Sequence, residues 1–193
     1  MATRIILHGG NSNIKSDKND DFYQEIIRGV EKDNLSVLCV YFARPEARWE
    51  DSYAEDQSVF HALGIETGRD LDTTMATYDM DELLGSIVEA DVIFISGGYN
   101  GHLKDTLLTI GVKNFRQMIQ GKTLVGISAG ANILGVYYYS QGSEEIREGI
   151  GLLNIKVLTH YSEDQTKQLA LLKSYKEDIP TVTVAEEEYV VIQ

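Results

Sequence analysis

The stretch Thr123-Leu-Val-Gly-Ile-Ser-Ala-Gly-Ala-Asn-Ile-Leu134 carries the strongest structural signal of the chain. A short apolar run leads into Gly126-Ile-Ser-Ala-Gly130, and small and apolar residues continue from there at helical spacing. This pattern is typical of a nucleophile elbow, a sharp strand-to-helix turn that lifts one side chain above the edge of a sheet. The two glycines permit such a turn, because a Cβ atom there would collide with neighbouring backbone. We therefore interpret Ser128 as a nucleophile, with the Ala129 amide facing an oxyanion; an ordinary Gly-Ser turn is the alternative.

The composition favours one globular domain, residues 1–193. A chain of 193 residues with 43% hydrophobic residues can bury a real core but is short for two domains. The formal net charge of −13 makes nucleic acid and acidic membranes poor partners, because both attract positive surfaces. No apolar run approaches the length of a membrane span, and the first residues do not resemble a signal peptide, so we expect a cytoplasmic protein.

The sequence indicates neither a metal site nor a cofactor site. Cys39 is the one cysteine, so no intrachain disulfide can form, and its position inside the apolar run Leu35–Phe42 predicts a buried thiol. The Cys, His and Asp residues do not have the spacing of metal ligands. Neither Gly9-Gly10 nor Gly97-Gly98 extends into a phosphate-binding loop. We predict no metal and no nucleotide.

Apolar runs alternate with helical patterns along the chain. The segments expected to be strands are Thr3–Leu7, Leu35–Phe42, Asp91–Ser96, the run before Ser128, Ile155–Thr159, Thr181–Val184 and Tyr189–Ile192, with a polar strand and loop in Gly64–Thr77. The segments expected to be helices are Asp21–Lys32, a stretch from Trp49 to Leu63, Asp79–Glu89, Leu103–Ile110, Val112–Ile119, Glu163–Tyr175 and the segment after Ser128. Unbroken apolar strands separated by helices are typical of a parallel sheet covered on both faces. The sequence predicts a single α/β domain with a mainly parallel sheet and helices on both faces.

Ligands of such folds bind at the carboxyl ends of the strands, and several reactive or flexible residues stand there. They are His8-Gly9-Gly10, Arg44, Gly97-Gly98-Tyr99-Asn100, Ser128 and His160. A nucleophilic serine needs a base within hydrogen-bond reach and an acid that orients this base. His160 ends a strand soon after the elbow helix, so we expect it beside Ser128 as the base. His8 is the second candidate, and the other two histidines fall within or at the start of expected helices.

Three motifs, Ile95-Ser-Gly-Gly98, Gly126-Ile-Ser-Ala-Gly-Ala-Asn132 and Leu158-Thr-His-Tyr161, follow one another along the chain. In this order and at these separations they resemble the dipeptidase E and cyanophycinase family of serine peptidases. The resemblance covers about residues 90 to 193 and implies a class I glutamine amidotransferase-like fold. It also implies a Ser-His-Glu triad with Ser128 as nucleophile and His160 as general base. The amides of Gly98 and Ala129 would then form the oxyanion hole.

The resemblance puts the third catalytic residue in a short acidic segment before the last strand. Here this segment is Ala185-Glu-Glu-Glu-Tyr-Val190, and the family pattern matches Glu186. The other candidates are Glu187 and Glu188, one or two residues away, and Glu144 or Glu145, which match a further acidic position of the family. A solvated run of charges is the alternative for the three C-terminal glutamates. The choice among these carboxylates stays open at this point.

Two departures from the family affect the expected substrate. The family has Gly-Gly-Asn after its third strand, whereas Asn100 stands one position later here, so its substrate contacts are not transferred. Relatives that cleave after aspartate carry arginine after the histidine, but here Tyr161–Lys167 is acidic. We expect short peptides or small amides, with neutral or basic dipeptides cleaved faster than aspartyl ones unless Arg44 or Arg48 faces the site. Local pairing with neighbouring glutamates is the simpler role for these two arginines.

Other functions fit the motifs less well. An α/β-hydrolase has the order Ser, acid, His, and far more chain between serine and histidine than separates Ser128 from His160. A glutamine amidotransferase needs a cysteine at the elbow. A catalytically silent member of the same fold, which binds a small molecule or a protein partner, is the main alternative. The oligomeric state is open, with a homodimer as one arrangement, and Tyr137–Tyr139 is expected at a strand edge against the core or a partner.

Overall fold

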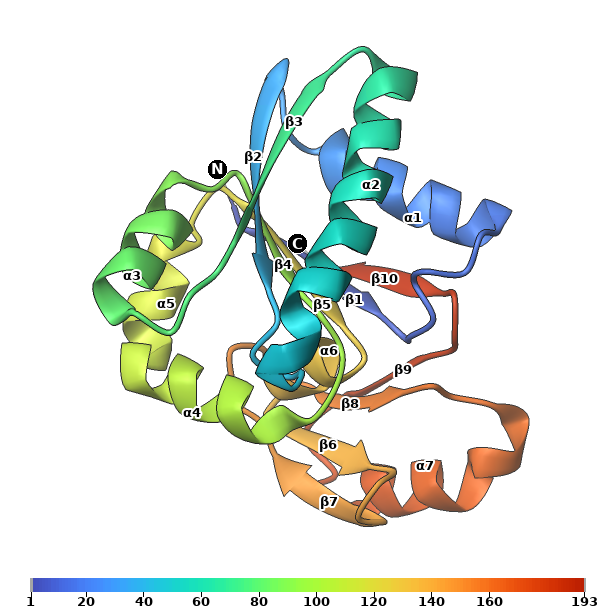
Figure 1. Cartoon of the computed structure of the whole chain (residues 1–193). Helices are drawn as coiled ribbons and strands as arrows, with labels where there is room; N and C mark the ends of the chain where they lie inside the picture. The colour runs from blue at the N-terminus through green and yellow to red at the C-terminus, as the bar shows by residue number, and fades with distance from the viewer. Residues whose placement is uncertain (1, 193) are drawn as a thin grey trace.

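The computed structural model describes residues 2–192, and Figure 1 shows a large sheet, a small sheet and the helices around them. The large sheet has six strands in the order β10-β1-β5-β4-β2-β3. Their bounds, in that order, are Tyr189–Ile192, Arg4–His8, Thr123–Ile127, Val92–Ile95, Asn34–Val40 and Asp70–Met75. Strand β10 runs antiparallel to β1, and all other neighbouring pairs in this sheet are parallel. The predicted fold class, a mainly parallel α/β sheet, is confirmed.

The small sheet has four strands in the order β7-β6-β8-β9. Their bounds, in that order, are Glu145–Glu148, Tyr137–Ser140, Lys156–Thr159 and Thr181–Val184. The sequence analysis did not separate this sheet from the large one, and it missed β7 because Glu145–Glu148 has no apolar pattern. The tyrosine run in β6 was expected at a strand edge, but β6 lies between β7 and β8 and buries Tyr138 and Tyr139.

Helices cover both faces of the large sheet, with α1 and α2 on one face and α3, α4 and α5 on the other (Figure 1). The helices are α1 (Asp17–Arg28), α2 (Trp49–Thr67), α3 (Met80–Glu89), α4 (Asn100–Ile110), α5 (Val112–Met118), α6 (Ala129–Leu134) and α7 (Thr166–Ser174), with short 3₁₀ helices η1 (Glu46–Arg48) and η2 (Glu163–Gln165).

Two helix boundaries differ from the sequence-based expectation because of capping. Helix α1 begins at Asp17 rather than Asp21, since the Ser16 side chain accepts a hydrogen bond from the Asn19 amide. Helix α2 continues past Leu63, and its last turn is closed by Gly68 in the left-handed conformation, with φ of 69°.

The core joins the two sheets. Strands β4 and β5 are buried at every position, as expected for parallel strands with helices on both faces. One cluster of buried apolar side chains includes Phe94 and Val125 of the large sheet and Val157 of the small one. Cys39 is buried in the same cluster and its thiol is free, as predicted. Among residues 2–192, no helix combines the length and the apolar character needed to cross a membrane.

The strand register brings three loops to one edge of the large sheet. Strand β5 lies between β1 and β4, and its Gly126 pairs with both Leu7 and Ile95, so the segments that follow these strands meet. The Ser128 amide donates to the His8 carbonyl at 2.9 Å. From the small sheet, the His160 amide donates to the Gly9 carbonyl at 3.2 Å. The contact between the two sheets therefore lies at the carboxyl ends of β1 and β5, where ligands of such folds bind.

Candidate active site

The turn between β5 and α6 holds Ser128 in a backbone conformation that few non-glycine residues adopt. Its φ of 51° and ψ of −108° lie outside the broadly allowed regions. Two hydrogen bonds hold this geometry: the Ser128 amide donates to His8 O, and the Ser128 carbonyl accepts from the Asn132 amide, both at 2.9 Å. Local backbone strain of this kind occurs at functional sites when the surrounding structure enforces it. The turn has the strained form of a nucleophile elbow.

The elbow needs glycine where the loop after β4 approaches it. A Cβ atom on Gly97 would lie 3.0 Å from the Ser128 Cβ, which is closer than ordinary van der Waals contact. At Gly98, with φ of 146°, a Cβ atom would collide with the Ala43 carbonyl. This close approach puts the Gly98 amide and the Ala129 amide, the first of α6, in the lining of the cavity that contains Ser128.

Neither of these two amides donates to a backbone acceptor within residues 2–192. The first amides of a helix have no partner inside the helix, which leaves Ala129 free to bind an external oxygen. The Gly98 amide makes no such bond either. The Ala43 carbonyl beside Gly98 accepts instead from the amide of the next residue, Tyr99, at 2.6 Å. An oxyanion hole requires N–H groups that are not already bonded, and the amides of Gly98 and Ala129 meet this condition.

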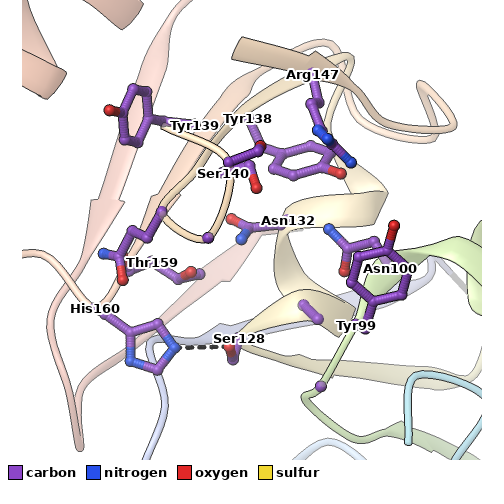
Figure 2. Close-up of a pocket in the computed structure, with 15 residues that line it drawn as sticks. Tyr99, Asn100, Ser128, Asn132, Tyr138, Tyr139, Ser140, Arg147, Thr159 and His160 are labelled. Atoms are coloured by element: carbon purple, nitrogen blue, oxygen red, sulfur yellow. Dashed lines mark hydrogen bonds between the residues drawn. The ribbon is translucent and has the colours of Figure 1, made fainter. Parts of the chain in front are cut away.

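His160 lies between Ser128 and Glu186. Ser128 Oγ is 2.7 Å from His160 Nε2, the contact drawn as a dashed line in Figure 2. On the other side of the ring, His160 Nδ1 is 3.1 Å from Glu186 Oε1. An ionised carboxylate can only accept, so Nδ1 carries the proton, and in the neutral imidazole Nε2 then accepts from the Ser128 hydroxyl. This tautomer can take up the serine proton.

The second carboxylate oxygen of Glu186 is held by the N-terminal loop. Asn11 donates from Nδ2 to Glu186 Oε2. The turn that contains Glu186 is fixed at both sides, since the Glu187 amide donates to Gly10 O and the Gly9 amide donates to Glu188 O, each at 2.9 Å. The loop after β1 also packs on the base, because a Cβ atom on Gly10 would collide with the His160 imidazole.

The other carboxylates named from the sequence have different surroundings. Glu188 pairs with Lys18 at 2.9 Å, and Glu145 pairs with Arg147 at 2.7 Å. Glu187 has φ of 58° and contributes its backbone amide to the turn, while Glu144, with φ of 55°, lies in the turn before β7. Of the five glutamates considered, Glu186 is the one that the structure brings to His160.

His8, the second candidate for the base, uses both ring nitrogens elsewhere. Its Nδ1 accepts from the Gly10 amide at 3.2 Å, and its Nε2 donates to Asn19 Oδ1 at 3.1 Å. The side chain is fully buried, and burial lowers the pKa of His8 to about 4, so the ring is neutral near pH 7. Asn19 in turn donates to the carbonyls of Asn11 and Ile14. His8 therefore anchors the N-terminal loop that holds Glu186.

Two cavities meet at the Ser128–His160 pair and share Gly98 and Tyr99 in their linings. The first has a volume of about 380 Å³, and Figure 2 shows its side chains. Besides Ser128 and His160, the polar and aromatic ones are Tyr99, Asn100, Asn132, Tyr138, Tyr139, Ser140, Gln141, Ser143, Arg147 and Thr159. Asn100 lines this cavity although it stands one position later than in the family pattern. Its Oδ1 and that of Asn132 are buried and accept no hydrogen bond from residues 2–192.

The second cavity, of about 410 Å³, lies against the loops after β1 and β2 and the start of α2. Its charged lining residues are Arg44, Arg48, Glu55 and Asp56. The expected pairing of these arginines with neighbouring glutamates is not found within residues 2–192: Arg48 approaches Asp51 at 3.8 Å, and Arg44 donates to the Ser52 hydroxyl at 2.9 Å. Glu163 and Asp164, the two acidic residues of the segment Tyr161–Lys167, line neither cavity.

The sequence analysis missed two residues of this region. Asn11 directly follows the His8-Gly9-Gly10 strand end, so its position was a usable signal that it could face the site. Arg147 had no such signal, because its strand, in which Ile146 is the single apolar residue, was not recognised. Within residues 2–192, no group of three or more His, Cys, Asp or Glu side chains is arranged to hold a metal ion.

The chain matches the family model of peptidase family S51 over residues 5–193. Its structure resembles that of a peptidase from an acI-B1 actinobacterium, with a TM-score of 0.67, 20% identity, and coverage of 100% of this chain and 84% of that chain. It also resembles a putative peptidase E protein from Listeria monocytogenes EGD-e, with a TM-score of 0.70, 16% identity, and coverage of 100% of this chain and 95% of that chain. No curated protein matches the sequence.

These comparisons confirm the resemblance that three short motifs indicated. The structural likenesses, at such low identity, show the fold alone. The family model spans nearly the whole chain, including the segment before residue 90 where the motifs were weak. The protein is a serine peptidase, and the chain belongs to peptidase family S51.

Proposed function

We propose that the protein hydrolyses short peptides with Ser128 as nucleophile, His160 as general base and Glu186 as the acid that orients the base. The continuous series of contacts supports this proposal: 2.7 Å from Ser128 Oγ to His160 Nε2 and 3.1 Å from His160 Nδ1 to Glu186 Oε1. Both distances lie within the range at which a proton can be passed or an imidazole oriented.

The reaction would proceed in two steps through an acyl-enzyme. His160 Nε2 takes the proton of Ser128 Oγ as the oxygen attacks the scissile carbonyl, and the amides of Gly98 and Ala129 bind the oxyanion that forms. The imidazolium then gives this proton to the leaving amine, and the C–N bond breaks. In the second step His160 activates a water, which attacks the ester carbonyl and releases Ser128. Glu186 stays ionised and stabilises the imidazolium in both steps.

The size of the cavities supports a small substrate. Volumes of about 380 and 410 Å³ lie near the lower end of the range for small-molecule sites, roughly 300–1,000 Å³. Specific recognition of a folded protein buries about 800 Å² on each partner, which these two cavities do not provide. We infer that the substrates are short peptides or small amides.

The structure restricts the charge of the peptide substrate less than the sequence suggested. Neutral or basic dipeptides were expected to be cleaved faster than aspartyl ones, on the condition that neither Arg44 nor Arg48 faces the site. Both arginines line the second cavity, and Arg147 lines the first. Charge repulsion alone therefore does not exclude acidic peptides, and the preference for neutral or basic dipeptides stays a prediction.

Labelling with a fluorophosphonate tests the assignment directly. The wild-type protein should form one adduct, which peptide mapping locates on Ser128, and the Ser128→Ala variant should form none. Hydrolysis of a panel of dipeptides should be lost in the same variant. An adduct that survives the substitution would show another nucleophile, and a folded wild-type protein that forms no adduct would favour the catalytically silent alternative.

A further inference from the structure

The second cavity contains a cation without an ionic partner. The Arg44 guanidinium lines it together with Ser128 and His160, and makes no ion pair within 4 Å among residues 2–192. We propose that Arg44 binds the free C-terminal α-carboxylate of the peptide substrate. This inference rests on the proposed peptidase function and adds to it the end of the substrate that the enzyme recognises.

The side chain of Arg44 is positioned before any substrate binds. The residue follows β2 at the carboxyl edge of the sheet, where its amide donates to Tyr41 O at 2.7 Å and its carbonyl accepts from Trp49 Nε1 at 3.0 Å. Its Nη1 donates to the Ser52 hydroxyl at 2.9 Å, which fixes the guanidinium against the start of α2. A side chain held in this way loses little further freedom when it binds a ligand.

The guanidinium keeps unused hydrogen-bond donors. The bond from Nη1 to Ser52 is its one side-chain bond within residues 2–192, and its Nε is buried without a partner. A guanidinium carries several N–H donors in a planar fork that matches the two oxygens of a carboxylate. An incoming carboxylate would therefore find in the remaining N–H groups of the guanidinium both a complementary charge and hydrogen-bond donors.

The other arginines near Ser128 are less suited to this role. Arg147, in the first cavity, already donates to Glu145 at 2.8 Å from Nε and lies 2.7 Å from it at Nη2. Arg48 is exposed and approaches Asp51. The acidic groups that face Arg44 are Glu55, which is exposed, and Asp56, which accepts from the Tyr41 hydroxyl at 2.6 Å. Neither acid comes within ion-pair distance of Arg44, so its charge is available to a ligand.

The geometry of the cavities supports a chain end as the ligand. They meet at Ser128, so a peptide with its scissile carbonyl there extends one end into each. The positive charge of Arg44 favours the C-terminal end in the second cavity, where a short peptide would place its free α-carboxylate, whereas a long chain would continue past it. Recognition of this group would select substrates by length rather than by side chain. An acidic side chain is the other source of a carboxylate.

Paired substrates separate these two sources. The rates for Leu-Ala and its C-terminal amide would be measured with the wild type and Arg44→Gln, together with Asp-Ala and Asn-Ala. We expect the wild type to prefer the free acid over the amide by at least about tenfold in kcat/KM, the size of a charge-assisted interaction. Arg44→Gln should lose this preference through a higher KM for the acid, with kcat and the rate for the amide little changed. Arg147→Gln is the matched control and should keep the ratio of acid to amide.

Two further measurements guard against misfolding and against failure of the proposed chemistry. The rate of fluorophosphonate labelling, which needs no carboxylate, should be the same in Arg44→Gln and the wild type. In the Ser128→Ala background, calorimetry should show that Arg44→Gln weakens binding of Leu-Ala but not of its amide, independently of catalysis. An unchanged ratio of acid to amide in Arg44→Gln would overturn the inference. A loss confined to Asp-Ala relative to Asn-Ala would assign Arg44 to the substrate side chain and would also overturn it.

Discussion

The elbow at Ser128 and the turn at Glu186 hold their side chains by different means. The elbow is enclosed by the sheet, and its partners are neighbouring residues or adjacent strands, such as Asn132 and His8. The turn is at the surface, with 48% of the Glu186 side chain exposed, and its hydrogen-bond partner Asn11 comes from the far end of the sequence. A nucleophile can thus be built from a local motif, whereas the acid of the same site depends on contacts between distant segments.

The largest effect is expected at the elbow. Replacing Ser128 by alanine should lower kcat by about 10⁶-fold, the scale seen when the nucleophile of a triad is removed. The substitution should leave the folded state intact, because the hydrogen bonds of the turn are made by the backbone. Peptide hydrolysis measured at high enzyme concentration, with circular dichroism as the control for folding, checks this. Residual activity within tenfold of the wild type would contradict the role of Ser128.

A smaller effect is expected at the surface turn. Glu186→Gln should lower kcat by about 10²- to 10⁴-fold, because the amide cannot stabilise the imidazolium or enforce its tautomer. Glu187→Gln and Glu188→Gln are matched controls, since neither side chain contacts His160, and both should stay within about threefold of the wild type. Steady-state kinetics of the three variants decide the assignment. A larger loss in either control than in Glu186→Gln would move the acid to that residue.

Loss of the hydrogen bond between Asn11 and Glu186 should have the next smaller effect on kcat. Asn11→Ala should lower kcat by about 10- to 100-fold, since an exposed carboxylate without its second hydrogen bond is held less firmly against His160. A positioning role predicts that the two substitutions are not additive. In the Glu186→Gln background, Asn11→Ala should have little further effect on kcat.

Full additivity of these two substitutions in a double-mutant cycle would mean that Asn11 acts other than through Glu186. A change confined to KM would point instead to a substrate contact, because Asn11 also lines the second cavity.

The smallest effect concerns stability and the loop anchored by His8. Burial lowers the pKa of this histidine from 6.5 to about 4, so between these values the unfolded chain binds a proton that the folded one does not. Above pH 6.5, His8 is neutral in both states and does not lower the free energy of unfolding. As the pH drops from 6.5 towards 4, protonation of the unfolded chain should lower this free energy. The loss amounts to about 3 kcal/mol at most, since each unit of pKa difference corresponds to about 1.4 kcal/mol.

Asp56 titrates in the opposite sense, because burial raises the pKa of its carboxyl to about 6 and favours the folded state as the pH falls. The effect of His8 is therefore measured as the difference between the wild type and His8→Gln in urea unfolding at pH 7 and pH 4.5. The variant should show the shallower decline in stability. Equal declines would mean that His8 is protonated in the folded protein.

Much of the large sheet could be predicted from the sequence. Of the small sheet, strands β8 and β9 were expected, but not that they form a separate sheet with β6 and β7. The apolar runs of β1, β2, β4 and β5 are long enough to mark buried parallel strands, and the glycines of the elbow mark its turn. Strand β7, Glu145–Glu148, pairs through its backbone, and Ile146 is its single apolar residue, which is too little to indicate a strand. No pattern in the sequence therefore indicated that Arg147 lines the first cavity.

The sequence by itself determined the fold class, the family and the two residues, Ser128 and His160, that lie 2.7 Å apart. These features follow from hydrophobic periodicity and from short motifs, which act over a few neighbouring residues. Only the tertiary structure decided which glutamate faces His160 and which arginine, Arg44, lines the same cavity as Ser128 without an ionic partner among residues 2–192. Adjacent glutamates are equivalent in composition and charge, and they become different only when a distant segment fixes the direction of each. The N-terminal loop at Gly9–Asn11 does this through hydrogen bonds that no local pattern specifies.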